Sequence, residues 1–379
     1  MSTHPTLRVL HCSAGNLHGG VETVLNTLAR QRALNPRLAP EFALGFEGRS
    51  SAELRAAGAT VHVLGPARVS RPWTFWSTRR RLRQLLAARP IDVVVSHGCW
   101  PHMLFGPAAR QYGRPLVYWM HDLAQGTHWI DRRAARTSPD LALANSQCTA
   151  EALPRLFPRA PRAVFYCPVS PPTVDPAEAR APIRDELATP PSVTVILQSS
   201  RLERWKGHAL LLAALGQLRD RPNWVAWIAG GAQRPSEQAY RDELIATANE
   251  AGIADRVRFL GQRSDVPRLL AAADIHCQPN TGPEPFGIAF IEALYAGRPV
   301  VSTRLGGAAE IVDDTCGILV PPGDANTLAE ALTRLIDDPD ARARLGAGGP
   351  ARARQLCDPA EALTRLESLL RSACAKGAR

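Results

Sequence analysis

The chain has 379 residues, of which 45% are hydrophobic and 21% are charged, and its formal net charge is +10. This length exceeds what one hydrophobic core usually supports, so we expect two domains. No apolar run approaches the roughly 20 residues that a membrane-spanning helix needs. The N-terminus lacks a basic stretch followed by an apolar signal core, and the eight cysteines include no CxxC pair, so we expect a cytoplasmic protein.

The first part of the chain alternates short apolar segments with helical patterns. The apolar segments are interpreted as buried strands at 7–12, 41–46, 60–65, 91–97, 115–121, 141–146 and 162–167. Helical patterns lie between them, for example at 22–34, 51–58 and 76–89. Short apolar runs separated by helices indicate a parallel sheet covered on both faces. We therefore expect a first Rossmann-like domain over residues 1–168.

Residues 68–89 form a basic and aromatic segment within this domain. No acidic residue lies between Glu53 and Asp92, whereas eight arginines do, and Trp73 and Trp76 stand at the start of the segment. A basic helix with aromatic residues at its start can lie on an anionic membrane, which would place the protein peripherally on the inner face. A solvated helix face in an arginine-rich protein is an equally consistent interpretation. Nucleic-acid binding is disfavoured because no recognition motif accompanies the charge.

A proline-rich stretch separates the two halves. Residues 168–182 contain five prolines in fifteen residues, too many for the interior of an element, so we interpret 169–185 as an interdomain linker. The alternation then restarts, with strands expected at 193–200, 224–231, 257–261, 274–279, 298–303 and 317–322. This pattern predicts a second doubly wound domain over 186–357. The last helical stretch, 358–379, is expected to complete the first domain.

Open parallel sheets bind ligands at the carboxyl ends of their strands, so the loops there are the candidate site. In the first domain Gly19 and Gly20 precede a helix whose free N–H groups can face a phosphate, although the loop is not a GxGxxG motif. In the second domain Arg201 and Lys206 follow the first strand. A planar guanidinium and a point charge together suit a diphosphate.

The segment EPFGIAFIEALYAG contributes two carboxylates eight residues apart. Glu284 is expected at the rim of the site, where it can accept hydrogen bonds from sugar hydroxyls. Gly287 starts a helix, and Glu292 falls in its second turn among packing residues. A ribose diol would supply two hydroxyl donors to Glu292 without a metal. The alternative for Glu292 is a buried ion pair with Arg298 or Arg304.

Three further features stand at predicted strand ends. Gly306 and Gly307 lie between a strand and a helix in STRLGGAAEIV. His97 and His121 each end a strand of the first domain. A lone histidine is more often structural than catalytic, but two at neighbouring strand ends raise the expectation of a functional role.

Together these motifs resemble the retaining, GT-B-fold glycosyltransferases of family 4 over nearly the whole chain. The similarity is carried by GGVE, HDL, SRLERWKG, EPFGIAFIE and GGAAE. It implies an α/β protein with two Rossmann-like domains facing across a cleft and a C-terminal helix that crosses back. It also implies hexosyl transfer from a nucleotide-diphosphate sugar to a hydroxyl of a saccharide, a lipid-linked acceptor or a small molecule, with no cofactor or metal.

The resemblance also implies roles for individual residues. Arg201 and Lys206 would hold the diphosphate, and Glu292 would bind the ribose. Glu284 would contact the transferred sugar, and His121 would lie over it. The remaining donor contacts would come from the backbone of Gly19, Gly20, Phe286, Gly287 and Ile288.

Other functions remain compatible with parts of the pattern. A GT-B-fold nucleotide-sugar epimerase shares the architecture but not the combination of R-x4-K with E-x7-E. A dinucleotide-dependent oxidoreductase needs an acid about 20 residues past the glycine loop, and Glu47 lies too far on. A non-catalytic protein that binds nucleotide sugars is a third possibility. The motifs do not distinguish UDP-, GDP- and ADP-sugars.

Overall fold

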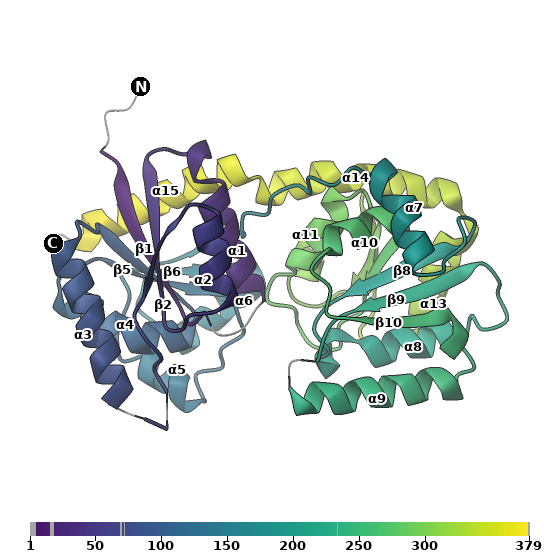
Figure 1. Cartoon of the computed structure of the whole chain (residues 1–379), viewed down its shortest axis with the longest axis horizontal. Helices are drawn as coiled ribbons and strands as arrows, with labels where there is room; N and C mark the ends of the chain where they lie inside the picture. The colour runs from purple at the N-terminus through teal and green to yellow at the C-terminus, as the bar shows by residue number, and fades with distance from the viewer. Residues whose placement is uncertain (1–4, 16–18, 69, 72, 233, 378–379) are drawn as a thin grey trace. The chain divides into compact units, whose positions relative to one another are not determined.

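The computed structural model describes residues 5–15, 19–68, 70–71, 73–232 and 234–377. The chain divides into two compact units (Figure 1). Unit 1 comprises Met1–Ser170 and Cys357–Arg379, and unit 2 comprises Pro171–Leu356.

Unit 1 contains a seven-stranded parallel sheet in the order β3-β2-β1-β4-β5-β6-β7. Its strands are β1 (Leu7–Ser13), β2 (Leu38–Leu44), β3 (Thr60–Val63), β4 (Val93–His97), β5 (Leu116–Met120), β6 (Leu141–Ala144) and β7 (Arg162–Val164). Its helices are α1 (Gly20–Arg30), α2 (Arg49–Ala56), α3 (Trp73–Ala88), α4 (Cys99–Gln111), α5 (Trp129–Ala134), α6 (Gln147–Ala152) and α15 (Pro359–Gly377). Every residue of β4 and β5 is buried, which confirms the prediction of a sheet covered on both faces.

Unit 2 contains a six-stranded parallel sheet in the order β10-β9-β8-β11-β12-β13. Its strands are β8 (Thr194–Ser199), β9 (Trp224–Ala229), β10 (Val257–Gly261), β11 (Ile275–Gln278), β12 (Val300–Thr303) and β13 (Gly317–Val320). Its helices are α7 (Pro176–Glu186), α8 (His208–Gly216), α9 (Pro235–Glu250), α10 (Val266–Ala272), α11 (Ile288–Tyr295), α12 (Ala308–Ile311), α13 (Ala325–Asp337) and most of α14 (Pro339–Cys357). The sheet reverses direction of winding at β8, as expected for a doubly wound domain.

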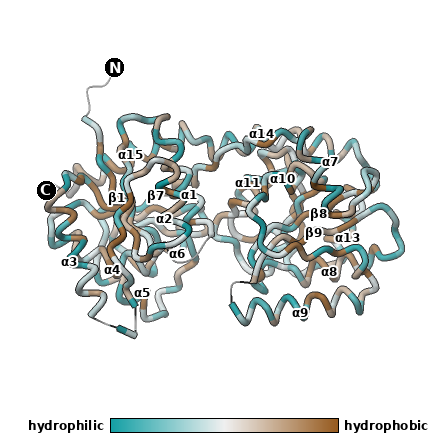
Figure 2. The backbone as a smooth tube through the Cα atoms, viewed as in Figure 1, coloured by the Kyte–Doolittle hydropathy of each residue, from teal (hydrophilic) through white to brown (hydrophobic). Residues whose placement is uncertain are grey.

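The hydropathy of the residues follows the division into inner strands and outer helices. In Figure 2 strand β1 is brown over much of its length, while the outer helix α9 changes between teal and brown along the chain. The core of unit 2 is built on aliphatic side chains from the sheet and from helices α8 and α13, including Ile196, Leu212 and Leu332. Burial of such side chains supplies the main driving force for folding.

The last helix belongs to unit 1, as predicted. Figure 1 shows α15 in yellow beside the strands of that unit. Its Glu367 is buried and accepts hydrogen bonds from Asn35, Arg37 and Arg371, each at 2.9 Å. The bonds from Asn35 and Arg37 tie the C-terminal helix to the turn between α1 and β2.

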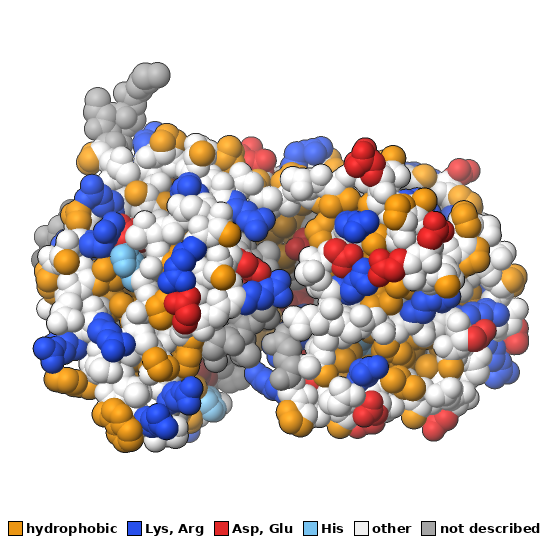
Figure 3. All heavy atoms as spheres, in the orientation of Figure 1, with side chains coloured by type: hydrophobic (Ala, Val, Ile, Leu, Met, Phe, Trp, Pro, Cys, Tyr) orange, Lys and Arg blue, Asp and Glu red, His pale blue; other side chains and the backbone are white. Residues whose placement is uncertain are grey.

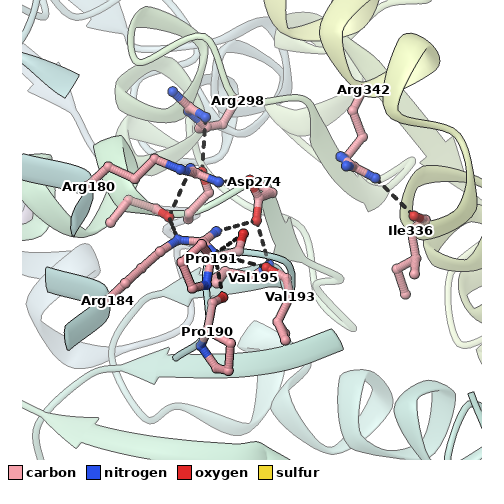
Figure 4. Close-up of polar contacts among 12 residues, drawn as sticks. Arg180, Arg184, Pro190, Pro191, Val193, Val195, Asp274, Arg298, Ile336 and Arg342 are labelled. Carbon is pink, nitrogen blue, oxygen red and sulfur yellow. Dashed lines mark hydrogen bonds and ion pairs between the residues drawn. The ribbon is translucent and has the colours of Figure 1, made fainter. Parts of the chain in front are cut away.

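The predicted linker is not entirely irregular, because α7 occupies most of it. Pro176 stands at the first helical position, where no N–H bond is lost, and Asp175 caps the helix. Pro182 inside the helix removes one backbone bond, and arginine contacts hold the helix in place (Figure 4). Arg184 is buried and donates to Asp274 at 2.6 Å and to four backbone carbonyls. Arg180 donates to the other oxygen of Asp274 at 2.7 Å.

Strand order determines which loops come together. Strands β8, β11 and β12 are neighbours in unit 2, so the loops that follow them lie at one edge of that sheet. Strands β1, β4 and β5 are neighbours in unit 1, and their following loops are likewise adjacent. These two edges carry the residues that the sequence singles out.

Candidate active site

The loop after β8 is packed closely against the loop after β11. Gly207 has a φ of +76°, and a Cβ at this position would lie 1.7 Å from the carbonyl oxygen of Pro279. Thr281 also donates its N–H to the carbonyl of Trp205 at 2.8 Å. Glycine at position 207 is therefore required both by the backbone conformation and by the approach of the second loop.

Lys206 and Glu284 form an ion pair between these two loops. Lys206 Nζ donates to Glu284 Oε2 at 2.5 Å, and the two side chains are 14% and 9% exposed. The side-chain amides of Gln278 and Asn280 donate to the same oxygen, each at 3.1 Å. Glu284 Oε1 makes no hydrogen bond among the described residues. One carboxylate oxygen is thus held by three donors, and the other remains able to accept.

Glu284 is buried, so the expectation of a position at the rim is wrong. Its backbone forms a bridge to Gly306, and its carbonyl accepts from the N–H of Gly307 at 2.7 Å. A Cβ at Gly306, whose φ is +58°, would lie 2.3 Å from the Glu284 carbonyl oxygen. The glycine pair that follows β12 therefore lets the loop of Glu284 pack closely against it, which leaves only 9% of the Glu284 side chain exposed.

Arg201 is held by acids that the sequence analysis did not identify. Its Nη2 donates to Glu237 in the first turn of α9 at 2.9 Å and lies 3.3 Å from Glu203. Its Nε is buried and makes no hydrogen bond among the described atoms. Glutamates in the first turn of a helix are usually exposed, so nothing in the sequence distinguished Glu237 from a surface carboxylate.

Gln278 and Asn280 were also missed by the sequence analysis. Both are fully buried and lie at the carboxyl end of β11. Polar side chains that end an apolar strand, as in DIHCQPN, were the available signal.

Helix α11 begins with backbone donors at its N-terminus. Gly287 precedes it with a φ of +109°, and a Cβ there would lie 2.4 Å from the ring of Phe290. Among the described residues the N–H groups of Gly287 and Ile288 donate no hydrogen bond. Phe286 is buried. The helix start combines unsatisfied donors with the positive end of the helix dipole, which favours an anion or a sugar oxygen.

Glu292 lies in the second turn of α11, as predicted, and is partly buried. In the described part of the chain it forms neither an ion pair nor a hydrogen bond. Arg298 instead donates to the carbonyls of Ala296 and Ala273, so the ion pair considered as an alternative is absent there. Burial raises the pKa of Glu292 to about 7. An unpartnered carboxyl with a strongly raised pKa is typical of a ligand-binding position.

The glycine loop of unit 1 lies partly outside the described residues, since 16–18 are not described. Gly19 caps α1 and Gly20 is its first residue. Among the described residues, a Cβ at Gly19 would meet only Glu22, at 3.8 Å. Gly19 makes no side-chain capping hydrogen bond at the N-terminus of α1 within the described part of the chain.

Three histidines are linked in unit 1, where the sequence analysis had considered two. His97 Nδ1 lies 2.9 Å from His121 Nε2, and His97 Nε2 lies 2.9 Å from His11 Nδ1. His11 lies inside β1, and its apolar surroundings in LRVLHC hid it from the sequence analysis. Burial lowers the pKa of His11 and of His121 to about 3 and holds that of His97 well below its ordinary value. The three rings are therefore neutral at pH 7.

The basic segment contains two kinds of arginine. Arg79 donates to the carbonyls of Met103 and Leu104, and Arg81 donates to the carbonyl of Leu64, so both are structural. Other members of the segment form the outer face of α3, where an open hollow is lined by Trp76, Arg80, Arg83, Gln84 and Ala87. Figure 3 shows more basic than acidic side chains on the visible face of unit 1.

None of the described helices is long and apolar enough to cross a bilayer. The described histidine, cysteine and acidic side chains form no group of three or more arranged to hold a metal ion.

Comparison with known proteins places the chain in a family. The model for Glycosyltransferase Family 4 matches residues 18–171, and that for Glycosyl transferases group 1 matches residues 179–352. A D-inositol 3-phosphate glycosyltransferase from Xylanimonas cellulosilytica is 31% identical over 70% of this chain and 68% of its own length. A lipopolysaccharide core biosynthesis glycosyltransferase, LpsE of Rhizobium meliloti, is 32% identical over 44% of this chain and 46% of its own.

A solved structure is similar over almost the whole molecule. HepE of Anabaena, crystallised with UDP and glucose, superposes with a TM-score of 0.85 and is 27% identical, covering 97% of this chain and 100% of that one. The chain therefore belongs to glycosyltransferase family 4, the retaining, nucleotide-sugar-dependent glycosyltransferases of the GT-B fold.

Proposed function

We propose that this protein transfers a hexose from a UDP-sugar to an acceptor hydroxyl during the assembly of a glycan or glycolipid. The observation that carries the proposal is the Lys206–Glu284 pair, buried between the loops after β8 and β11. The choice of UDP is supported by the HepE complex with UDP and glucose. The choice of acceptor class is supported by relatives named for inositol phosphate and for lipopolysaccharide core.

Unit 2 is proposed to hold the donor diphosphate. Lys206 has three N–H donors and uses one on Glu284, so it can donate to a phosphate oxygen at the same time. Arg201 is fixed by Glu237 and is 30% exposed, which leaves part of its guanidinium accessible. The backbone of Gly19 and Gly20 at the start of α1 is proposed to bind a phosphate oxygen of the donor.

The two carboxylates are proposed to bind the two sugars of the donor. Glu292 would accept hydrogen bonds from the 2′ and 3′ hydroxyls of the ribose, which compensates its buried charge. Glu284 would accept a hydroxyl of the transferred hexose through Oε1. The backbone N–H groups of Phe286, Gly287 and Ile288 are proposed to donate to oxygens of the same donor.

The chemistry is proposed to depend on charge stabilisation. Bond cleavage leaves negative charge on the departing diphosphate, and Arg201, Lys206 and the N-terminus of α11 would stabilise it. Retention is proposed to arise by front-face attack, in which the leaving phosphate takes the proton of the acceptor hydroxyl. His121 would contact the hexose near its reacting carbon.

The outer face of α3 is proposed to contact an anionic phospholipid surface. Trp73 and Trp76 are 68% and 62% exposed, and Arg80 lies 5.8 Å from the ring of Trp76. Exposed tryptophans beside arginines that form no ion pair with any described residue match the interfacial and headgroup regions of a membrane. Such contact would keep the enzyme near a lipid-linked acceptor.

The test is the release of UDP from UDP-glucose by variants of the ion pair. Lys206→Ala leaves Glu284 with two amide donors, so the variant is expected to fold and to lose at least about 100-fold in turnover. Glu284→Gln is expected to lose activity comparably. Arg204→Ala is the matched control, because Arg204 lies in the same loop but is exposed and paired with Glu243. Wild-type turnover in both ion-pair variants would overturn the assignment.

A further inference from the structure

The hydrogen-bonded histidines of unit 1 reach from the core to the partly exposed His121. His11, His97 and His121 come from the neighbouring strands β1, β4 and β5, and both N···N distances are 2.9 Å. His11 is 1% exposed and His97 is 3% exposed. The role proposed above for His121 uses only the last ring, so the two buried rings have no function yet.

Packing prevents the rings from turning. The His97 ring lies 5.1 Å from the ring of His121 and 5.1 Å from that of Trp119, which itself lies 5.0 Å from His121. His11 stacks on Phe42 at 5.6 Å. A buried ring inside such a stack can change its hydrogen bonds only by moving protons, because rotation would need the neighbours to separate.

Counting protons leaves two arrangements. Each neutral imidazole carries one N–H, and among the described residues no carboxylate bonds to any of the three rings. If His97 carries its proton on Nδ1, it donates to His121 Nε2, so His121 must carry its own proton on Nδ1. If His97 carries its proton on Nε2, it donates to His11 Nδ1. His97 Nδ1 then accepts from the N–H at His121 Nε2, so His121 Nδ1 carries no proton. The tautomer of His11, the most buried of the three rings, therefore determines the tautomer of His121.

The surroundings of His11 favour the first arrangement. His11 lines a small cavity of about 10 Å³ together with Arg32 and otherwise apolar side chains. Arg32 is a donor without acceptor capacity, and no side chain of this lining can accept a hydrogen bond from an imidazole N–H. An N–H on His11 Nε2 would therefore find no side-chain acceptor in this lining, whereas a bare Nε2 needs none.

We propose that His11 and His97 are positioning residues that hold His121 in the tautomer with its proton on Nδ1. His121 then presents an N–H donor, and the group that fits it is an oxygen of the transferred hexose. The inference rests on the proposed contact between His121 and the donor sugar. It adds a fixed direction to that contact, since a bare Nδ1 could only accept.

The test measures the tautomers directly. In protein labelled with ¹⁵N-histidine, two-bond ¹H–¹⁵N correlations separate Nδ1–H from Nε2–H rings, and His121→Gln assigns the His121 signals. We expect His121 to be the Nδ1–H form across pH 6–8. His11→Leu removes the donor at the buried end, so it should shift His121 towards Nε2–H and lower kcat for UDP-glucose turnover by up to about tenfold with little change in KM. His11→Asn places an amide N–H near the lost Nδ1 and should restore both.

The outcomes separate this inference from the proposed function. An Nε2–H form of His121 in the wild-type protein would overturn the inference, as would the same tautomer and kcat in His11→Leu and wild type. The wild-type spectrum decides the question even if His11→Leu does not fold. Full turnover by His121→Ala would instead remove the role of His121 in the reaction, whatever its tautomer.

Discussion

Glu292→Gln replaces the unpartnered carboxyl of α11 with a neutral amide of nearly the same shape. Burial raises the pKa of Glu292 from 4.5 to about 7, so the folded protein binds this proton more tightly than the unfolded chain. A raised folded-state pKa stabilises the fold below pH 4.5, and this contribution is lost as the pH rises towards 7 and above. The variant cannot ionise and should escape that loss.

The size of the effect follows from the shift. Ionising Glu292 in the folded protein at pH 8 costs about 3 kcal/mol relative to the unfolded chain. Between pH 5 and pH 8 the stability of Glu292→Gln relative to wild type should therefore rise by about 2 to 3 kcal/mol. The two proteins share every other titrating group, so the difference isolates this carboxyl.

Urea unfolding at pH 5, 6, 7 and 8 measures the difference. Donor binding supplies a second arm, because ribose hydroxyls that donate to the carboxylate should lower its pKa. UDP binding near pH 7 should then release part of a proton, which appears as an enthalpy that depends on the ionisation enthalpy of the buffer. Glu292→Gln should lose this dependence and bind UDP more weakly.

A stability difference that stays constant from pH 5 to pH 8 would refute the raised pKa of the partly buried Glu292. Equal proton release by both proteins would refute its contact with the ribose while leaving its burial intact.

Three further predictions concern the fold and the surface. Arg184→Ala leaves the partly buried Asp274 with one arginine fewer and should lower the free energy of unfolding by about 3 to 5 kcal/mol. Arg180→Ala should lower it less, because Arg180 is 38% exposed. Intrinsic tryptophan fluorescence during urea unfolding measures both variants. Gly207→Ala should fail to bind UDP, because its Cβ meets the Pro279 carbonyl. Gly252 has a similar φ of +69° but open space around it, so Gly252→Ala should lower the free energy of unfolding by only about 1 kcal/mol. Nucleotide titration and thermal melting compare the two variants. Changing Arg80 and Arg83 together to glutamine should weaken cosedimentation with anionic vesicles about 30-fold at low salt.

The controls for these predictions are taken from the same chain. Equal destabilisation by Arg180→Ala and Arg184→Ala would contradict the proposed anchoring of α7. Normal UDP binding by Gly207→Ala would show that the loops after β8 and β11 need not touch. Arg204→Gln, which removes an exposed cation from unit 2, should leave vesicle binding unchanged, and an equal loss there would point to net charge instead of the face of α3.

The sheets could be predicted because their strands are apolar on both faces. Segments such as VVVSH and LVYWM admit few other structures, and the histidines His97 and His121 at their carboxyl ends mark the edge of the candidate site. Helix α7 could not be predicted from composition, because its stability depends on Arg184 reaching Asp274, 90 residues away. A tertiary contact of that kind overrides the local signal of Pro182 inside the helix.

The candidate site could likewise be predicted only in part from the sequence. Lys206, Glu284 and Glu292 could be predicted as site residues from their motifs and from their positions after predicted strands. The ion pair could not, because Lys206 and Glu284 are separated by 78 residues and meet only when two loops pack through Gly207. Burial of Glu284 depends in turn on Gly306 and Gly307, whose missing side chains let the loops approach.

The central claim is that the loops around Lys206 and Glu284 bind a UDP-sugar. Saturation-transfer NMR with UDP-glucose, GDP-mannose and ADP-glucose tests it on the wild-type protein and on Lys206→Ala, with Arg204→Ala as control. The account predicts transfer to the ribose and hexose protons of UDP-glucose in wild type and in Arg204→Ala, and its loss in Lys206→Ala. Equal transfer to UDP-glucose in wild type and Lys206→Ala, or no transfer to any of the three nucleotide sugars, would contradict it.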